Sequence, residues 1–172
     1  MPKRKLLLDV GCGDAKSCIK FAKEGYAVIG VEKNSAVFEK AKINVNASEE
    51  KKHIKLYNRG IREMKLNQKF DGILCSFVLM FMPKEDCLAL LEKFYAKLNP
   101  KGELLVKMLM LDDPMAINSK QNENVFFPSY AELREIKEQY KGTLKFKLLR
   151  DNAHNNLDFP HIHSVGILKI IK

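Results

Sequence analysis

A carboxylate and two glycines near the start of the chain are the first residues whose types and spacing could do chemistry. Asp9, Gly11 and Gly13 follow an apolar run at residues 6–8, in the stretch LLLDVGCGDAKS. An apolar run that breaks into glycines predicts a buried strand ending in a tight turn. Glycine lets the backbone approach a ligand closely, and a helix after the turn directs free N–H groups toward that ligand. The stretch therefore predicts a site for a nucleotide-like ligand.

A second carboxylate narrows the class of ligand. The next apolar run, at residues 27–31, ends in Glu32, and a carboxylate at that place can accept hydrogen bonds from both hydroxyls of a ribose. A dinucleotide fingerprint would need a small residue at position 16, where this chain has Lys16. The pattern favours an adenosine ligand, and a nicotinamide oxidoreductase on the same type of sheet is the less favoured alternative.

Two histidines and two aspartates in the last third of the chain are the other candidates. His161 and His163 are spaced so that both rings lie on one side of an extended segment, where they could meet a metal or an acceptor. Asp112 and Asp113 begin a polar segment, residues 111–125, that could act as a lid. A turn or strand-edge role for the histidines, and a solvated or helix-capping role for the aspartates, are favoured over these functions. We expect no metal site and assign no catalytic base.

Alternating apolar and amphipathic segments must position these residues. The strands that we expect in the first two thirds are residues 5–9, 26–31, 53–57, 70–75 and 103–109. Between them we expect two helices. The first runs from Ala15 to Glu24, and the second is capped by Asn34 or Ser35 and runs to about Asn46. This alternation predicts an α/β fold with a doubly wound, mostly parallel, seven-stranded sheet and helices on both faces.

The second half predicts two more helices and a closing hairpin. A helix after Pro83 should bury an apolar stripe, and the residues 99–102 should then turn the chain. The stripe consists of Cys87, Leu91, Phe94 and Leu98, widened by Leu88 and Tyr95. Ser129 and Glu132 have the spacing of a capping box. Strands at 144–148 and 164–171 are joined by too short a loop for a crossover, which predicts a C-terminal antiparallel hairpin.

Length and composition are those of a globular protein with one domain, residues 1–172. The chain is 46% hydrophobic and 30% charged, and its longest nearly apolar run, residues 72–82, is too short to cross a bilayer. We therefore expect no membrane partner and a cytoplasmic location. The four cysteines form no C-x-x-C pair, which favours buried structural thiols in a reducing compartment.

The net charge of +9 is unevenly distributed along the chain. Basic residues outnumber acidic residues two to one in residues 1–69 and are nearly balanced beyond them. A basic surface could attract RNA or another polyanion by releasing counterions. Because lysine far outnumbers arginine, a solvated lysine-rich surface is the favoured interpretation.

Four motifs in order resemble the class I S-adenosylmethionine-dependent methyltransferases. They are DVGCGDA at 9–15, VIGVEKN at 28–34, KFDGILCSFVLMFM at 69–82 and LNPKGELLVKM at 98–108. In this order they are similar to the family's glycine turn, the end of its second strand with an acidic residue, its fourth strand and the start of its fifth strand. The small size and the late FFPSYAELREIKEQY most resemble the tellurite-resistance type of small-molecule methyltransferase.

The resemblance implies a cofactor site for S-adenosylmethionine. The glycine turn with Asp9 would shape its methionine end, Glu32 would hold the ribose, Gly60 and Ile61 would flank the adenine, and Ser76 and Phe77 would face the methyl group. The implied cofactor-binding residues are Asp9, Gly11, Cys12, Gly13, Glu32, Lys33, Gly60, Ile61, Ser76 and Phe77. Ala15 replaces the third glycine of the family's first motif, and Gly60 replaces its frequent aspartate.

The implied function is transfer of a methyl group to a small-molecule acceptor by in-line displacement. An Asp/Asn-Pro-Pro-aromatic motif and a Pro-Cys nucleophile, which mark two nucleic-acid-methylating classes, are absent from the sequence. The family usually has a helical cover before its first strand, whereas here about five residues precede it, so we expect little or no N-terminal cap. The alternatives are a cofactor-binding subunit completed by a partner protein and a methyltransferase acting on RNA.

Overall fold

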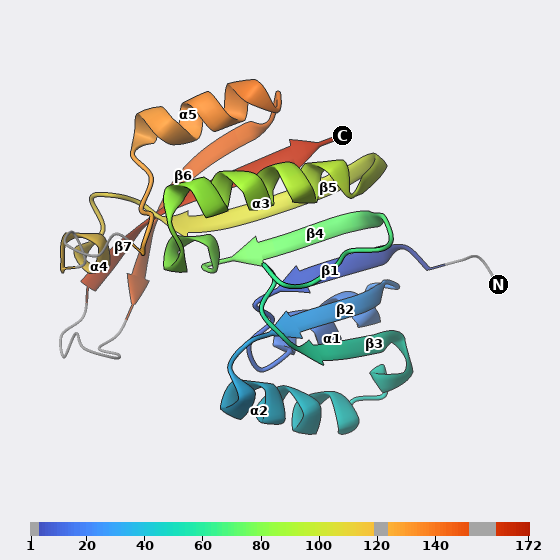
Figure 1. Ribbon diagram of the computed structural model, residues 1–172. Coiled ribbons are helices and arrows are strands. Elements are labelled where there is room, and N and C mark those ends of the chain that lie inside the picture. Colours follow the sequence, from blue (N-terminus) through green and yellow to red (C-terminus); the bar gives the residue numbers. More distant parts are fainter. Residues whose placement is uncertain (1–3, 119–123, 152–160) are drawn as a thin grey trace. The chain divides into compact units, whose positions relative to one another are not determined.

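A seven-stranded mixed sheet organises the chain, of which a computed structural model describes residues 4–118, 124–151 and 161–172 (Figure 1). The strands are β1 (Leu6–Val10), β2 (Ala27–Glu32), β3 (Ile54–Asn58), β4 (Phe70–Ser76), β5 (Leu98–Leu109), β6 (Thr143–Asp151) and β7 (His161–Ile171). The α-helices are α1 (Lys16–Lys23), α2 (Ser35–Asn46), α3 (Lys84–Ala96), α4 (Pro114–Asn118) and α5 (Tyr130–Gln139). Two short 3-10 helices are η1 (Lys51–His53) and η2 (Leu79–Phe81).

The strand order is β3-β2-β1-β4-β5-β7-β6. β1 pairs in parallel with β2 and with β4, β2 pairs in parallel with β3, and β6 pairs antiparallel with β7. The prediction of a doubly wound, mostly parallel sheet with a C-terminal antiparallel hairpin is therefore confirmed. The chain divides into two compact units, the first made of residues 1–75, 92–104 and 172, the second of 76–91 and 105–171.

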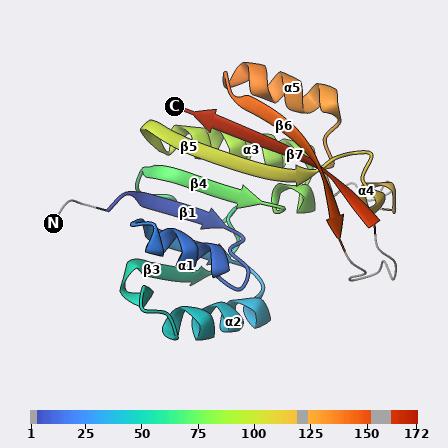
Figure 2. The ribbon, with the colours of Figure 1, turned by 180° about the vertical axis from the view of Figure 1, so that it is seen from behind.

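In the first unit, two helices pack on one face of the parallel strands. Small buried residues of α1 and α2 form a core with apolar residues of β1, β2 and β3, and Figure 2 shows α1 against these strands. The helical members of this core are Cys18 and Ala22 from α1 and Ala41 and Val45 from α2. Small side chains let the helices lie close to the sheet, which fixes where each strand-to-helix turn emerges.

The ends of these helices follow the predicted signals. The Asn34 side chain accepts a hydrogen bond from the Val37 N–H and so caps α2, as the sequence predicts. Gly25 follows α1 with φ of 95°, a left-handed conformation that glycine adopts without strain. Both predicted helices are confirmed to within a residue or two.

The expected turn at residues 99–102 is wrong, because this segment already belongs to β5. The Lys101 N–H donates to the Lys172 carbonyl at 2.7 Å, and the Lys172 N–H donates to the Gly102 carbonyl at 3.1 Å. Lys101 has φ of 65°, so the chain bends there without leaving the strand. The sequence signal of proline and glycine is therefore satisfied by a local distortion of the strand.

The stripe predicted for α3 is partly corrected. Cys87, Leu91 and Phe94 are buried as expected, but Leu90 is buried in place of the exposed Leu88. Tyr95 is only partly buried, and Leu98 belongs to β5. Leu90 lies three residues from Cys87 and four from Phe94, so it completes a helical face that the sequence pattern left ambiguous.

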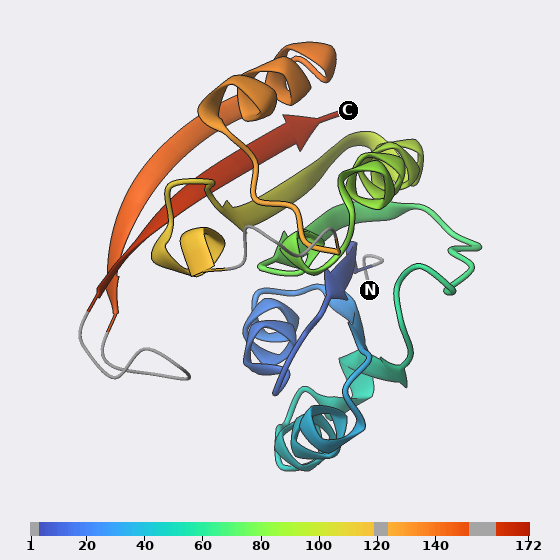
Figure 3. The ribbon, with the colours of Figure 1, turned by 60° about the vertical axis from the view of Figure 1, so that its left-hand side comes forward.

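In the second unit, α5 packs on the hairpin of β6 and β7, which run side by side (Figure 3). Leu133 and Ile136 are the buried residues of α5, and a Cβ atom at Gly166 of β7 would collide with Leu133. β6 is the outermost strand, and Leu148 on it is 73% exposed. Of the connection predicted at 151–162, residues 152–160 lie outside the described residues.

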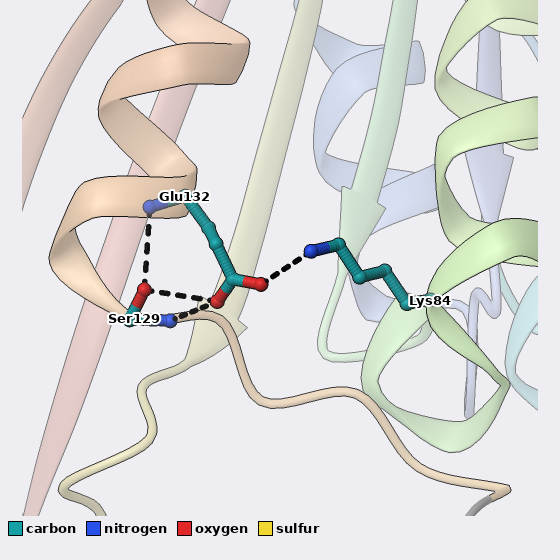
Figure 4. A network of polar contacts seen from close by, with 3 residues as sticks. All are labelled: Lys84, Ser129 and Glu132. Carbon is teal, nitrogen blue, oxygen red and sulfur yellow. Dashed lines mark hydrogen bonds and ion pairs between the residues drawn. The ribbon is translucent and has the colours of Figure 1, made fainter.

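A polar network at the start of α5 confirms the predicted capping box (Figure 4). The Glu132 N–H donates to Ser129 Oγ at 3.3 Å, and Glu132 Oε2 accepts from the Ser129 N–H at 2.8 Å. Lys84, at the start of α3, extends the network with Nζ 2.6 Å from Glu132 Oε1. Partial burial raises the pKa of Glu132, but hydrogen bonds from Lys84 and Ser129 outweigh it and hold the pKa below its ordinary value.

We expect Glu132→Ala to lower the free energy of unfolding by about 1 kcal/mol, because it removes half of the capping box. The exposed ion pair with Lys84 adds little to this cost. Urea unfolding followed by circular dichroism measures the change. Glu135→Ala removes the same charge from an exposed position of α5 and is the control. An equal loss in both variants would mean that charge, and not the cap, stabilises the helix.

Candidate functional site

The turn after β1 is built from residues in the left-handed region of φ. Gly11 has φ of 65°, Gly13 has φ of 57°, and Ala15, which precedes α1, has φ of 65°. A Cβ atom at Gly13 would have no atom within 4 Å, so the space beside this residue is open. The turn therefore leaves the backbone at Gly13 accessible.

Cys12, between the two glycines, is turned into the protein. Its side chain is buried in the core with Cys18, and its N–H donates to the Val31 carbonyl at 3.0 Å. Its own carbonyl accepts from the Ala15 N–H at 3.0 Å. Cys12 thus fixes the shape of the turn by joining it to β2. All four cysteines of the chain are buried, and none forms a disulfide.

Asp9, the last acid before the turn, is buried and faces α1. Its Oδ2 accepts hydrogen bonds from Ser17 Oγ and, at 3.3 Å, from the Cys18 thiol. Burial raises the pKa of Asp9, and the hydrogen bonds from Ser17 and Cys18 offset part of this rise. The carboxylate therefore ties the strand to the first turn of α1 and so positions the start of the helix.

Glu32 brings a second carboxylate to the same turn. It is the last residue of β2, which lies next to β1, and its Oε2 accepts from the Gly13 N–H at 3.1 Å. Its Oε1 accepts from the Asn34 N–H at 2.8 Å. A carboxylate has about four lone-pair sites, so these two bonds leave acceptor capacity for ligand hydroxyls. Gly13 and Glu32, predicted separately from sequence, are in direct contact.

Asn58 is a residue of this region that the sequence analysis missed. It ends β3, and its Nδ2 donates to the carbonyls of Glu32 and Lys33 at 2.8 and 3.2 Å. Its Oδ1 accepts from Ser35 Oγ at 2.9 Å. The signal for it was a polar residue at the carboxyl end of a strand, as with Glu32. Asn58 holds the end of β2, and so the backbone on both sides of the Glu32 carboxylate.

Gly60 and Ile61 lie on the connection after β3. The Ile61 side chain is buried, and its carbonyl accepts from Lys93 Nζ at 3.5 Å. The same Nζ donates to the Met64 carbonyl at 2.9 Å. This lysine of α3 anchors the connection, so the backbone at Gly60 and Ile61 is held in a fixed place within the first unit.

Ser76 and Phe77 stand at the end of β4, where the second unit begins. Phe77 has φ of 57°, an uncommon conformation for a bulky residue, and its N–H donates to the Lys107 carbonyl at 2.8 Å. Its ring packs against a buried apolar cluster of the second unit that includes Met80, Leu109 and Val165. Strained backbone of this kind is concentrated at functional sites.

The two adjacent aspartates divide between the two roles expected for them, and Asp113 is in addition buried. It is fully buried, whereas Asp112 is exposed and accepts from the Tyr130 hydroxyl at 3.1 Å. Asp113 Oδ1 accepts from the Met115 N–H at the start of α4, at 2.9 Å, which is the helix-capping role that the sequence allowed. Its Oδ2 accepts from the Ser164 N–H at 2.9 Å and lies 2.9 Å from His163 Nδ1.

His163 is accordingly buried in β7, between β5 and β6 in strand order, and not at an edge of the sheet. It is paired with Asp113 in the second unit. The His161 side chain lies outside the described residues, as do 119–123 of the segment considered as a lid. Among the described residues, no group of three or more His, Cys, Asp or Glu side chains could hold a metal ion.

The comparisons with known proteins agree with the fold. The profile of a family described as "Methyltransferase domain" matches residues 7–102, which run from β1 into β5. The chain belongs to this family, and its strand order and its four sequence motifs are those of the class I S-adenosylmethionine-dependent methyltransferases. The resemblance inferred from the four sequence motifs is confirmed.

Individual relatives cover the chain to different extents. Carboxy-S-adenosyl-L-methionine synthase from Vibrio campbellii is 30% identical over 104 residues, which are 58% of this chain and 42% of that protein. The match thus spans less than half of the curated relative. TehB from Haemophilus influenzae is similar in structure with a TM-score of 0.74 and 19% identity, over 99% of this chain and 58% of that one.

A third relative was crystallised with two ligands. The 1,6-didemethyltoxoflavin-N1-methyltransferase of Burkholderia thailandensis has a TM-score of 0.68 and 17% identity, over 99% of this chain and 72% of that chain. Its structure contains 1,6-didemethyltoxoflavin and S-adenosylhomocysteine. At this level of identity the likeness shows the fold.

Among the described residues of the present chain, no helix is long and apolar enough to cross a membrane.

Proposed function

We propose that this chain binds S-adenosylmethionine at the turn after β1 and transfers the methyl group to a small-molecule acceptor. The contact between Glu32 Oε2 and the Gly13 N–H, beside open space at Gly13, is the observation that carries the proposal. It joins a hydrogen-bond acceptor for ribose hydroxyls to exposed backbone for the rest of the ligand. Family membership supports the same ligand.

The residues around this contact have distinct proposed roles. Gly11 and Gly13 let the cofactor approach the backbone, while Asp9 and Cys12 keep the turn in shape through their bonds to α1 and β2. Glu32 and Lys33 lie at the end of β2, where the ribose would bind. Gly60 and Ile61 offer backbone to the adenine, and Ser76 and Phe77 remain predicted neighbours of the methyl group.

The proposed chemistry makes modest demands on the protein. The sulfonium of the bound cofactor supplies an activated methyl group for in-line displacement. The chain must then hold cofactor and acceptor in register and exclude water, which can provide most of the rate acceleration. A general base is needed only for an acceptor that loses a proton. A small-molecule acceptor is supported by the Burkholderia relative, whose bound acceptor is of that kind.

The first test is calorimetric titration of the purified chain with S-adenosylmethionine and with S-adenosylhomocysteine, using NAD as the control ligand. We expect saturable binding of the first two and none of NAD, because Lys16 stands where a dinucleotide site needs a small residue. Thermal unfolding in the same buffer verifies that the protein is folded. A folded chain that binds neither sulfur compound, or that binds NAD equally well, would overturn the proposal.

The acceptor class is tested next, with the folded, cofactor-binding protein. Release of S-adenosylhomocysteine is measured against a panel of small nucleophiles, comprising thiols, amines, phenols and carboxylic acids, and against total RNA. We expect turnover with a member of the small-molecule panel. Turnover with RNA alone would reject the small-molecule acceptor while leaving the cofactor assignment intact.

A further inference from the structure

A groove on the first unit lies apart from the turn that holds the proposed cofactor site. It has a volume of about 360 Å³ and is formed by α2, η1 and β3. β3 stands at the end of the strand order, so no strand of the described sheet covers its outer edge. None of the residues proposed to bind the cofactor lines the groove. We call it the basic groove because of its lysines, described next.

Apolar side chains form the floor of the basic groove. Ile54 and Leu56 are two residues apart on β3 and therefore project from the same face of the strand. Ile54 is only 7% exposed, and Leu56 and Phe38 are partly buried. Phe38 lies in the first half of α2 and supplies an aromatic wall. The floor thus offers apolar surface on which the apolar part of a ligand can be buried.

Three lysines surround this floor. Lys42 lies one helical turn after Phe38, with Nζ 5.6 Å from the centre of the Phe38 ring and 2.8 Å from Glu39 Oε2. Lys51 and Lys52 are exposed on η1 and form no ion pair with a residue that the structure describes. Within the described part of the chain, no acidic residue lines the groove. Lys51 and Lys52 therefore supply the positive charge of the rim, whereas the charge of Lys42 is paired with Glu39.

We propose that the basic groove binds an anionic amphiphile: a small molecule with an aromatic or aliphatic body and a carboxylate, sulfonate or phosphate head. The body lies on Phe38, Ile54 and Leu56, and the head lies between the exposed lysines. The volume is at the lower end of the range of small-molecule sites, which suits a ligand of this size. This binding site is separate from the proposed methyl transfer and does not depend on it.

The test uses 8-anilinonaphthalene-1-sulfonate, a fluorescent anionic amphiphile, with the chain of residues 1–172. We expect saturable binding that dodecanoate displaces and that S-adenosylhomocysteine leaves unchanged. Lys51→Gln combined with Lys52→Gln should weaken binding about five- to tenfold at low salt, the effect of two exposed charges. Lys51→Arg with Lys52→Arg should retain it. Amide chemical shifts should change in residues 38–56.

Matched variants decide between the groove and other surfaces. Lys145→Gln with Lys147→Gln removes the same charge from β6 in the second unit, where both lysines are exposed, and should leave binding unchanged. Phe38→Ala should weaken binding of the probe without removing a charge. Equal effects of the two lysine pairs, or displacement of the probe by S-adenosylhomocysteine, would overturn the proposal. Equal affinity for the uncharged N-phenyl-1-naphthylamine would also overturn the proposal. Loss of probe binding on self-association of the chain would overturn it as well.

Discussion

Replacing Asp113 by alanine should lower the free energy of unfolding by about 3–5 kcal/mol, the cost of removing one partner from a buried polar pair. The carboxylate is fully buried and joins three donors: the N–H groups of Met115 and Ser164 and, at Nδ1, the His163 ring. Alanine would leave all three without their acceptor in a place that water does not reach. Urea unfolding followed by circular dichroism measures the loss.

The adjacent aspartate provides the control for this variant. Asp112 is exposed and accepts one hydrogen bond, from the Tyr130 hydroxyl. Asp112→Ala should change stability by no more than about 0.5 kcal/mol, as surface substitutions usually do. Asp113→Asn keeps one acceptor oxygen and should fall between the two alanine variants. If Asp113→Ala costs no more than Asp112→Ala, the buried network does not hold α4 and β7 together.

The parts of the fold predicted well from sequence are those with local causes. The cap of α2 by Asn34 and the capping box of Ser129 and Glu132 each involve residues three apart, so their spacing alone predicts them. The strands near the turn are short apolar runs bounded by glycine or acid. Glu32 was found for the same reason, since it ends such a run.

The parts predicted less well depend on register between distant segments. Asp113 and His163 are 50 residues apart, and each alone is compatible with a surface position; only the pairing of β7 with its neighbours buries them together. The Gly102 carbonyl similarly finds its donor at Lys172, which turns an expected loop into strand. Whether a polar side chain is buried depends on the hydrogen-bond partners that the fold brings to it. Sequence patterns do not show those partners, so they cannot locate such pairs.

Glu32→Ala should weaken binding of S-adenosylhomocysteine by about 1–3 kcal/mol, which is about five- to 150-fold in affinity. The variant removes the proposed acceptor for the ribose hydroxyls and also frees the Gly13 and Asn34 N–H groups. Calorimetric titration measures the change. Glu24→Ala, which removes the same charge at the exposed end of α1, should bind with unchanged affinity.

A modified ligand separates the two effects of Glu32, which are holding the ribose hydroxyls and shaping the Gly13 turn. Only the first effect depends on the hydroxyls of the ligand. S-adenosylhomocysteine lacking the ribose 2′-hydroxyl cannot use the carboxylate fully, so the native chain should bind it several-fold more weakly than the parent compound. If Glu32 holds the ribose, this discrimination should disappear in Glu32→Ala, and the double-mutant cycle gives the energy of that contact. If the variant discriminates as strongly as the native chain, Glu32 acts by shaping the Gly13 turn, and the ribose binds elsewhere.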